Sequence, residues 1–108
     1  MLTRLLLILA AAAPLGARAS SPRQLWDEKC ASCHAPDGSG NTKTGRRLHI
    51  KDYTDPKVQA GFSDAGLLKN FLLGVADEDG NYRMPAYKDK VSVEDAKELV
   101  ALIRSFKK

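Results

Sequence analysis

The 108-residue chain has only two cysteines, two methionines and one tryptophan. Two cysteines cannot build the disulfide framework of a small secreted scaffold, so a thin core needs another source of stability. Aromatic residues make up 6% of the sequence, and no basic cluster is interleaved with them, which argues against nucleic-acid binding. The chain also lacks internal repeats, linkers and the length for a second domain.

The one long apolar run lies at the N-terminus. Arg4 precedes an apolar stretch that stops before Pro14, and residues 17–19 (Ala-Arg-Ala) fit a signal-peptidase site. The run is shorter than the roughly 20 residues that span a bilayer. No cysteine follows the cleavage site, which argues against a lipid anchor. We expect residues 1–19 to be a cleaved secretory signal peptide and residues 20–108 to form a single domain with no stable membrane span.

The segment Cys30-Ala31-Ser32-Cys33-His34 is a C-x-x-C-H motif, the pattern of covalent haem attachment. The two-residue gap lets both thiols reach the vinyl groups on one edge of a porphyrin, and the adjacent imidazole can bind the iron. We expect one haem c joined to Cys30 and Cys33 by thioethers, with His34 as the proximal ligand. This large apolar group would support the thin core, so the apoprotein is expected to be poorly ordered.

Other chemistries also use two cysteines at this spacing. A thioredoxin-like dithiol would need a βαβ pattern around it, which the sequence lacks, and would leave His34 unexplained. A zinc site needs about four ligands, and His49 would complete the number, but adjacent Cys33 and His34 suit tetrahedral geometry poorly. A disulfide between Cys30 and Cys33 would close a very short loop and add little stability.

Met84-Pro85 forms a second motif, 50 residues after His34. With the C-x-x-C-H motif and the signal peptide, it makes the sequence resemble the class I c-type cytochromes, which are small proteins with a single haem. The resemblance covers nearly all of the chain after residue 20 and implies that Met84 is the distal iron ligand. Pro85 keeps the neighbouring backbone extended, so a long thioether can reach out of a loop.

The resemblance implies an all-α fold of the small cytochrome c type, with crossing N- and C-terminal helices and loops wrapped around one covalent haem. Capping patterns favour both terminal helices. Ser21 and Gln24 form a capping box for the first, and Ser92, followed by acidic residues, starts the last. We expect Trp26 to be buried where the two helices meet.

Between the terminal helices, Ser63 is expected to cap a helix that ends at Gly74. Three glycines predict that residues 34–45 form a loop. A metal-bound histidine usually donates its second N–H to a carbonyl or carboxylate. Related cytochromes commonly offer a proline carbonyl after such a loop. This sequence lacks that proline, so we expect a backbone carbonyl near Gly45 or Arg46 to accept the hydrogen bond.

A haem with His34 on one side and Met84 on the other has no open position for a substrate. The soft sulfur favours Fe(II) and raises the reduction potential. The resemblance therefore implies a soluble, monomeric one-electron carrier, not an enzyme, that docks transiently with redox proteins. It also implies a periplasmic location, because bacteria attach c-type haem outside the cytoplasm. The alternative is a ligand-binding or catalytic haem protein whose sixth position is open or taken by His49.

Two further hypotheses concern basic residues. One of Arg46, Arg47 and Lys51 is expected to pair with a haem propionate, the alternative being a solvated basic surface. Lysines near an exposed haem edge would steer redox partners electrostatically. The candidates for that patch are Lys43, Lys88 and Lys90.

Overall fold

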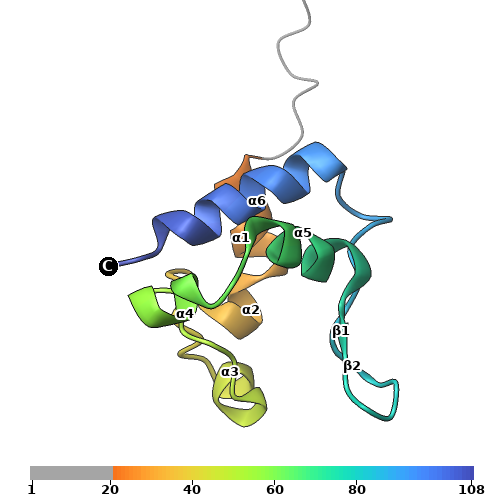
Figure 1. The fold of residues 1–108 in the computed structure, drawn as a ribbon, viewed down its shortest axis with the longest axis horizontal. Coiled ribbons are helices and arrows are strands. Elements are labelled where there is room, and N and C mark those ends of the chain that lie inside the picture. The colour runs from red at the N-terminus through yellow and green to blue at the C-terminus, as the bar shows by residue number, and fades with distance from the viewer. Residues whose placement is uncertain (1–20) are drawn as a thin grey trace, which may run out of the picture.

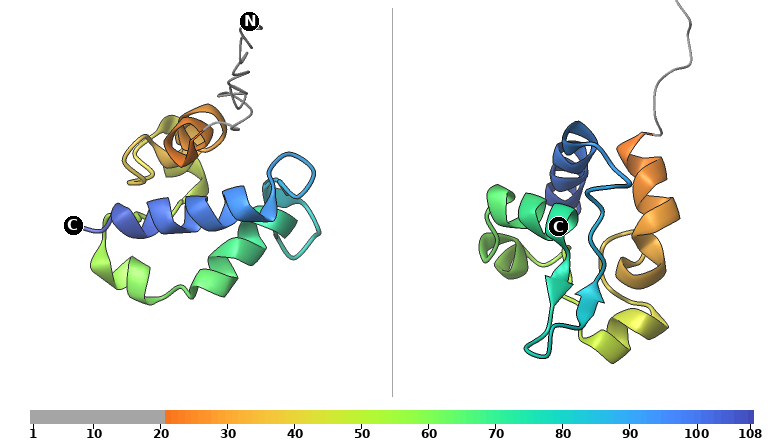
Figure 2. Two further views of the ribbon diagram at one scale, coloured as in Figure 1. Left: turned by 90° about the horizontal axis from the view of Figure 1, so that it is seen from above. Right: turned by 90° about the vertical axis from the view of Figure 1, so that its right-hand side faces the viewer.

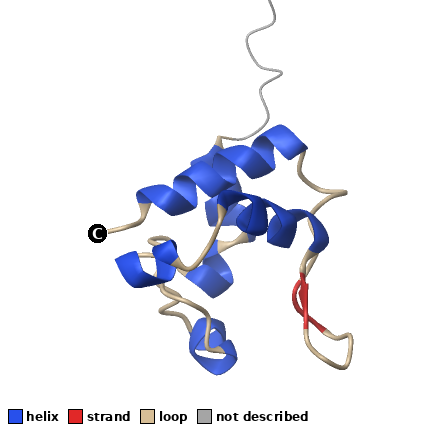
Figure 3. Cartoon of the chain, in the orientation of Figure 1, coloured by secondary structure: helices blue, strands red, loops and turns tan. Residues whose placement is uncertain are grey.

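The structure, a computed structural model, describes residues 21–108, so the predicted signal peptide lies outside the described residues. Helices dominate this part of the chain, and one small sheet accompanies them (Figure 1, Figure 3). The elements in chain order are α1 (Pro22–Lys29), α2 (Ala31–His34), α3 (Lys43–Leu48), α4 (Pro56–Ala60), α5 (Asp64–Leu73), β1 (Val75–Ala76), β2 (Tyr82–Met84) and α6 (Val93–Ser105).

The terminal helices α1 and α6 pack against each other and cross, as the views from the front and from above show (Figure 1, Figure 2). Trp26 is 1% exposed at this contact, and its ring centroid lies 5.0 Å from that of Phe106. Ser21 and Gln24 form the predicted capping box, and the Ser92 hydroxyl accepts a hydrogen bond at the start of α6. The predicted crossing of the terminal helices is confirmed.

Helix α5 packs against α6 and completes the core. Ser63 accepts a hydrogen bond from the Gly66 N–H at 2.9 Å, and Gly74 ends the helix with a φ of 75°. Both ends are therefore where the capping residues predict them. Leu67 and Phe71 are the buried residues of α5, and both also line the central cavity described below.

Two features differ from the sequence-based expectation. Helix α3 begins at Lys43, inside the segment 34–45 that was expected to be a loop, because the Thr42 side chain caps it by accepting from the Gly45 N–H. The all-α fold also carries a short antiparallel hairpin in which β1 pairs with β2, with Val75 opposite Met84. Strands this short show no alternation of apolar and polar residues that the sequence could reveal. The hairpin nevertheless positions Met84, which is the last residue of β2.

Candidate functional site

A cavity of about 310 Å³ opens in the middle of the domain, within the usual range for ligand pockets. The four site residues expected from the sequence, Cys30, Cys33, His34 and Met84, all line it. Much of the remaining wall is apolar and comes from elements far apart in the chain. Those apolar and aromatic wall residues include Trp26, Leu48, Ile50, Tyr53, Phe62, Leu67, Phe71, Val75, Pro85, Tyr87 and Ile103.

A single helical turn presents the three residues of the C-x-x-C-H motif to the cavity. Cys30 ends α1 and begins α2, and its carbonyl accepts from the N–H groups of Cys33 (3.2 Å) and His34 (2.9 Å). The three side chains therefore stand at positions i, i+3 and i+4, which share one face of a helix. Both cysteines are free thiols in the structure.

The thiol environment bears on the alternatives to haem attachment. Burial raises the pKa of the Cys30 thiol to about 11, so this thiol is protonated at neutral pH. A redox dithiol of the thioredoxin type needs a thiolate near neutral pH, which burial of this kind opposes. Over residues 21–108, no group of three or more His, Cys, Asp or Glu side chains is arranged to hold a metal ion. Neither the dithiol nor the zinc interpretation gains support from the geometry.

The backbone after His34 is held in an unusual conformation. Ala35 has φ 67° and ψ 157°, is 4% exposed, and accepts a hydrogen bond at its carbonyl from Trp26 Nε1 at 3.0 Å. The His34 carbonyl accepts from the Gly40 N–H at 2.8 Å. Burial lowers the pKa of His34, so its imidazole is neutral at neutral pH, which is the form that binds metal ions.

The expected acceptor for the second nitrogen of His34 is absent. Nδ1 is buried and has no hydrogen-bond partner among the described residues. The carbonyls of Gly45 and Arg46 are already used at the end of α3, where they accept from the N–H groups of Ile50 (2.9 Å) and His49 (3.3 Å). The prediction of a carbonyl near Gly45 or Arg46 is therefore wrong, because neither carbonyl accepts a hydrogen bond from Nδ1 in the structure.

Aromatic rings surround the imidazole instead. The Tyr53 ring stacks on it with a centroid distance of 5.6 Å and an interplanar angle of 16°. The Trp26 ring lies 5.5 Å away at 45°. Burial raises the pKa of Tyr53, so the phenol stays neutral beside the imidazole. Sequence reasoning missed Tyr53, since nothing in its neighbourhood indicates a contact with the motif.

Met84 reaches the cavity from the end of the hairpin. Gly74 makes this possible, because a Cβ at its position would lie 2.7 Å from the Met84 carbonyl oxygen. The segment that follows is tied to two helices by Tyr87. Its N–H donates to the Phe71 carbonyl at 2.9 Å, and its hydroxyl donates to the Lys29 carbonyl at 3.2 Å. Met84 itself is half-buried, and these contacts of the backbone before and after it hold it at the cavity.

Cationic side chains border the cavity, and none of the described residues that line it is acidic. Of the three basic residues considered for propionate binding, Lys51 lines the cavity and Arg46 and Arg47 do not. Arg83 also lines it, and its guanidinium donates to the Leu48 carbonyl. Its place directly before Met84 was the one sequence signal that could have identified it.

The sequence matches a family described as cytochrome c oxidase, cbb3-type, subunit III over residues 17–103. The chain belongs to this family. Among solved structures, it is similar to the c-type cytochrome KustC0563, with a TM-score of 0.71 and 29% identity over 82% of this chain and 100% of that chain. A point mutant of KustC0563 gives 0.68 and 28% over the same shares. No curated protein sequence matches significantly.

The chain is therefore a small c-type cytochrome, and the predicted cytochrome c fold is confirmed. Membership implies covalently bound haem c with its iron and a role in electron transfer. The residues present fit that group, since two thiols, a neutral imidazole and a thioether meet at one mostly apolar cavity. Among the described helices, none is both long and apolar enough to cross a bilayer.

Proposed function

We propose that this cytochrome carries single electrons between redox proteins and that His34 and Met84 ligate the iron of one haem c attached through Cys30 and Cys33. The observation that carries the proposal is the convergence of these four side chains on one cavity, although Met84 lies 50 residues from His34 in the sequence. The bound group supplies reversible one-electron chemistry, and the protein supplies ligands, burial and charge.

Each ligand has a distinct task. Burial keeps the imidazole of His34 neutral and able to bind. Its Nδ1 atom is buried in the protein, so Nε2 is the nitrogen that is available to bind the iron. The Met84 thioether is a soft ligand that favours Fe(II) and raises the reduction potential. If His34 and Met84 both bind the iron, the site would have no place for a substrate, which supports a carrier and not an enzyme.

The cavity wall contributes in two further ways. Its apolar residues would exclude water from a bound haem iron, which would also favour the less charged reduced state. Lys51 and Arg83 border the same space and would offset the negative charge of the haem propionates. The absence of acidic side chains among the described lining residues agrees with an anionic group at this edge.

The cellular setting forms part of the proposal. The apolar run after Arg4 and the cleavage pattern at 17–19 support a signal peptide over residues 1–19 and a single domain over residues 20–108. Secretion agrees with a periplasmic monomer that docks transiently with redox partners through a small interface. The matched family is named for a subunit of an oxidase. One-electron transfer is the proposed role whether this protein acts as a free carrier or as a subunit of a larger complex.

The deciding experiment expresses the chain with a haem-attachment system and replaces Met84 by Ala. Mass spectrometry of the intact protein should show one covalent haem. The oxidised wild-type protein should show a weak far-red sulfur-to-iron charge-transfer band, and the reduced wild-type protein should not bind carbon monoxide without displacement of a ligand. Met84→Ala should lose the band in the oxidised state and bind carbon monoxide readily in the reduced state.

His49→Ala is the matched control, because His49 also lines the cavity. It should keep the far-red band and the closed site. A wild-type protein that binds carbon monoxide freely would instead indicate an open sixth position. A site that opens in His49→Ala and not in Met84→Ala would indicate ligation by two histidines.

A further inference from the structure

His34 is held in a way that differs from the usual arrangement of metal-binding histidines. A second hydrogen bond normally fixes the ring and raises its basicity. Here Nδ1 is buried and has no acceptor among the described residues. Two aromatic rings contact the imidazole, with Tyr53 nearly parallel to it at 5.6 Å and Trp26 inclined at 5.5 Å. The orientation of the ring therefore depends on the positions of these two side chains.

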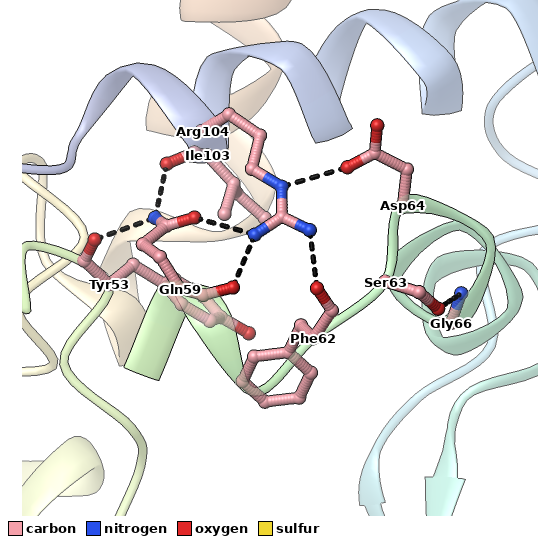
Figure 4. Close-up of polar contacts among 8 residues, drawn as sticks. All are labelled: Tyr53, Gln59, Phe62, Ser63, Asp64, Gly66, Ile103 and Arg104. Atoms are coloured by element: carbon pink, nitrogen blue, oxygen red, sulfur yellow. Dashed lines mark hydrogen bonds and ion pairs between the residues drawn. The ribbon is translucent and has the colours of Figure 1, made fainter. Parts of the chain in front are cut away.

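Tyr53 lies in the irregular segment between α3 and α4, so its own position needs an explanation. Its N–H donates to the Gly38 carbonyl at 2.9 Å. Its carbonyl accepts from Nε2 of Gln59 at 2.7 Å (Figure 4). The same Gln59 nitrogen donates to the Ile103 carbonyl in α6 at 2.8 Å. Gln59 is 5% exposed, so it joins the Tyr53 backbone to α6 from inside the protein.

Arg104 determines which way the Gln59 amide faces. A guanidinium only donates hydrogen bonds, so the oxygen of the amide must point toward it and the nitrogen toward Tyr53. Arg104 donates to Gln59 Oε1 at 3.0 Å and to the Gln59 carbonyl at 2.6 Å. It also donates to the Phe62 carbonyl at 2.6 Å and to Asp64 at 2.8 Å (Figure 4). These contacts leave the amide a single satisfied orientation.

We infer that Tyr53 is a positioning residue that sets the orientation of the His34 ring, and that Gln59 and Arg104 hold Tyr53 in place. This inference rests on the proposed function, because it takes His34 as an iron ligand. Stacking restrains the plane of the ring without strengthening its donor character, whereas a hydrogen bond at Nδ1 would do both. The ring plane in turn determines how the imidazole orbitals overlap with those of the iron.

The test uses the haem-loaded protein in its oxidised state and measures the proton NMR signals shifted by the iron. The spread and order of the haem methyl signals report the plane of the axial imidazole. Tyr53→Leu removes the stacked ring and should change this pattern. Tyr53→Phe keeps the ring and removes the hydroxyl, so it should retain the wild-type pattern. The reduction potential, measured on the same samples, should shift for Tyr53→Leu and stay constant for Tyr53→Phe.

Gln59→Glu tests the supporting contacts. It removes the donor to the Tyr53 carbonyl and keeps an oxygen for Arg104, so the methyl pattern should change in the same direction as in Tyr53→Leu. Asp64→Asn is the control, because Asp64 contacts Arg104 on its exposed side and leaves Gln59 untouched. It should match the wild type. If Tyr53→Leu does not fold, Gln59→Glu decides the outcome.

A wild-type pattern in Tyr53→Leu, or in Gln59→Glu where that variant decides, would overturn the inference. Failure of the proposed function looks different, since the wild-type protein itself would then lack a covalent haem or show no iron-shifted His34 signals. The two failures are therefore distinguished by the wild-type spectrum alone.

Discussion

At the scale of single residues, the conformation of Ala35 is the most informative feature of the site. Its φ of 67° with ψ of 157° lies in a region that is almost restricted to glycine and costs about 1–3 kcal/mol for other residues. The conformation turns the chain sharply after His34. The hydrogen bond from Trp26 Nε1 to the Ala35 carbonyl satisfies both groups inside the core. Trp26 therefore acts as a donor as well as a core residue.

Ala35→Gly should stabilise the haem-loaded protein by about 1 kcal/mol, because the relief of strain exceeds the added entropy of the unfolded chain. Urea denaturation monitored by circular dichroism would measure the change. Ala101→Gly, an exposed position inside α6, is the matched control and should lower the stability by about 1 kcal/mol. Two variants that both destabilise would show that Ala35 carries no strain.

At the scale of elements, the contact between α2 and α3 depends on one missing side chain. The Thr42 hydroxyl donates to the Cys33 carbonyl at 2.6 Å and accepts from the Gly45 N–H at 2.8 Å. A Cβ at Gly45 would lie 2.1 Å from the Gly40 carbonyl oxygen and 2.7 Å from that of Cys33. Only glycine lets α3 approach the haem-attachment motif this closely.

Gly45→Ala should therefore cost about 3 kcal/mol, since the clash is with backbone on both sides and no side chain can move away. The measured quantities would be the urea midpoint and the yield of haem-loaded protein. Gly61→Ala is a suitable control, because Gly61 has a φ of −79° and its added Cβ would make only ordinary contacts from 3.4 Å. Equal stabilities for the two variants would contradict the packing shown here.

Element boundaries differ in how far local sequence predicts them. Ser21, Ser63 and Ser92 cap helices where the sequence predicts, because a cap involves residues within one turn of each other. Helix α3 was missed because its close packing requires the distant Cys33 carbonyl as well as the Thr42 cap. The β1–β2 hairpin was missed because its strands are too short for alternation to show.

At the scale of the whole molecule, the cavity is the main constraint on stability. About 310 Å³ in the middle of a small domain is surrounded by apolar side chains that pack on each other only in part. Leaving such a surface to water removes much of the driving force for folding. We therefore expect the covalent group to have a structural role beside its redox role.

The double variant Cys30→Ala/Cys33→Ala, which cannot attach haem, should lose cooperative thermal unfolding and most near-UV circular dichroism while it keeps part of its helical signal. Ser32→Ala lies in the same turn, is exposed, and should leave both properties unchanged after haem attachment. A sharp thermal transition in the double variant would show that the polypeptide packs without the group.

The sequence by itself determined the attachment motif, the candidate ligands and the main helix caps, because each depends on residues within a turn of one another or on a single side chain's chemistry. Only the tertiary structure decided that Met84 meets His34 at one cavity, and that the Tyr53 ring stacks on His34, whose Nδ1 has no acceptor among the described residues. These are contacts between distant segments. The packing of α6 against α1 and α5, and the Gln59 and Arg104 bonds, create them, and no local pattern encodes them.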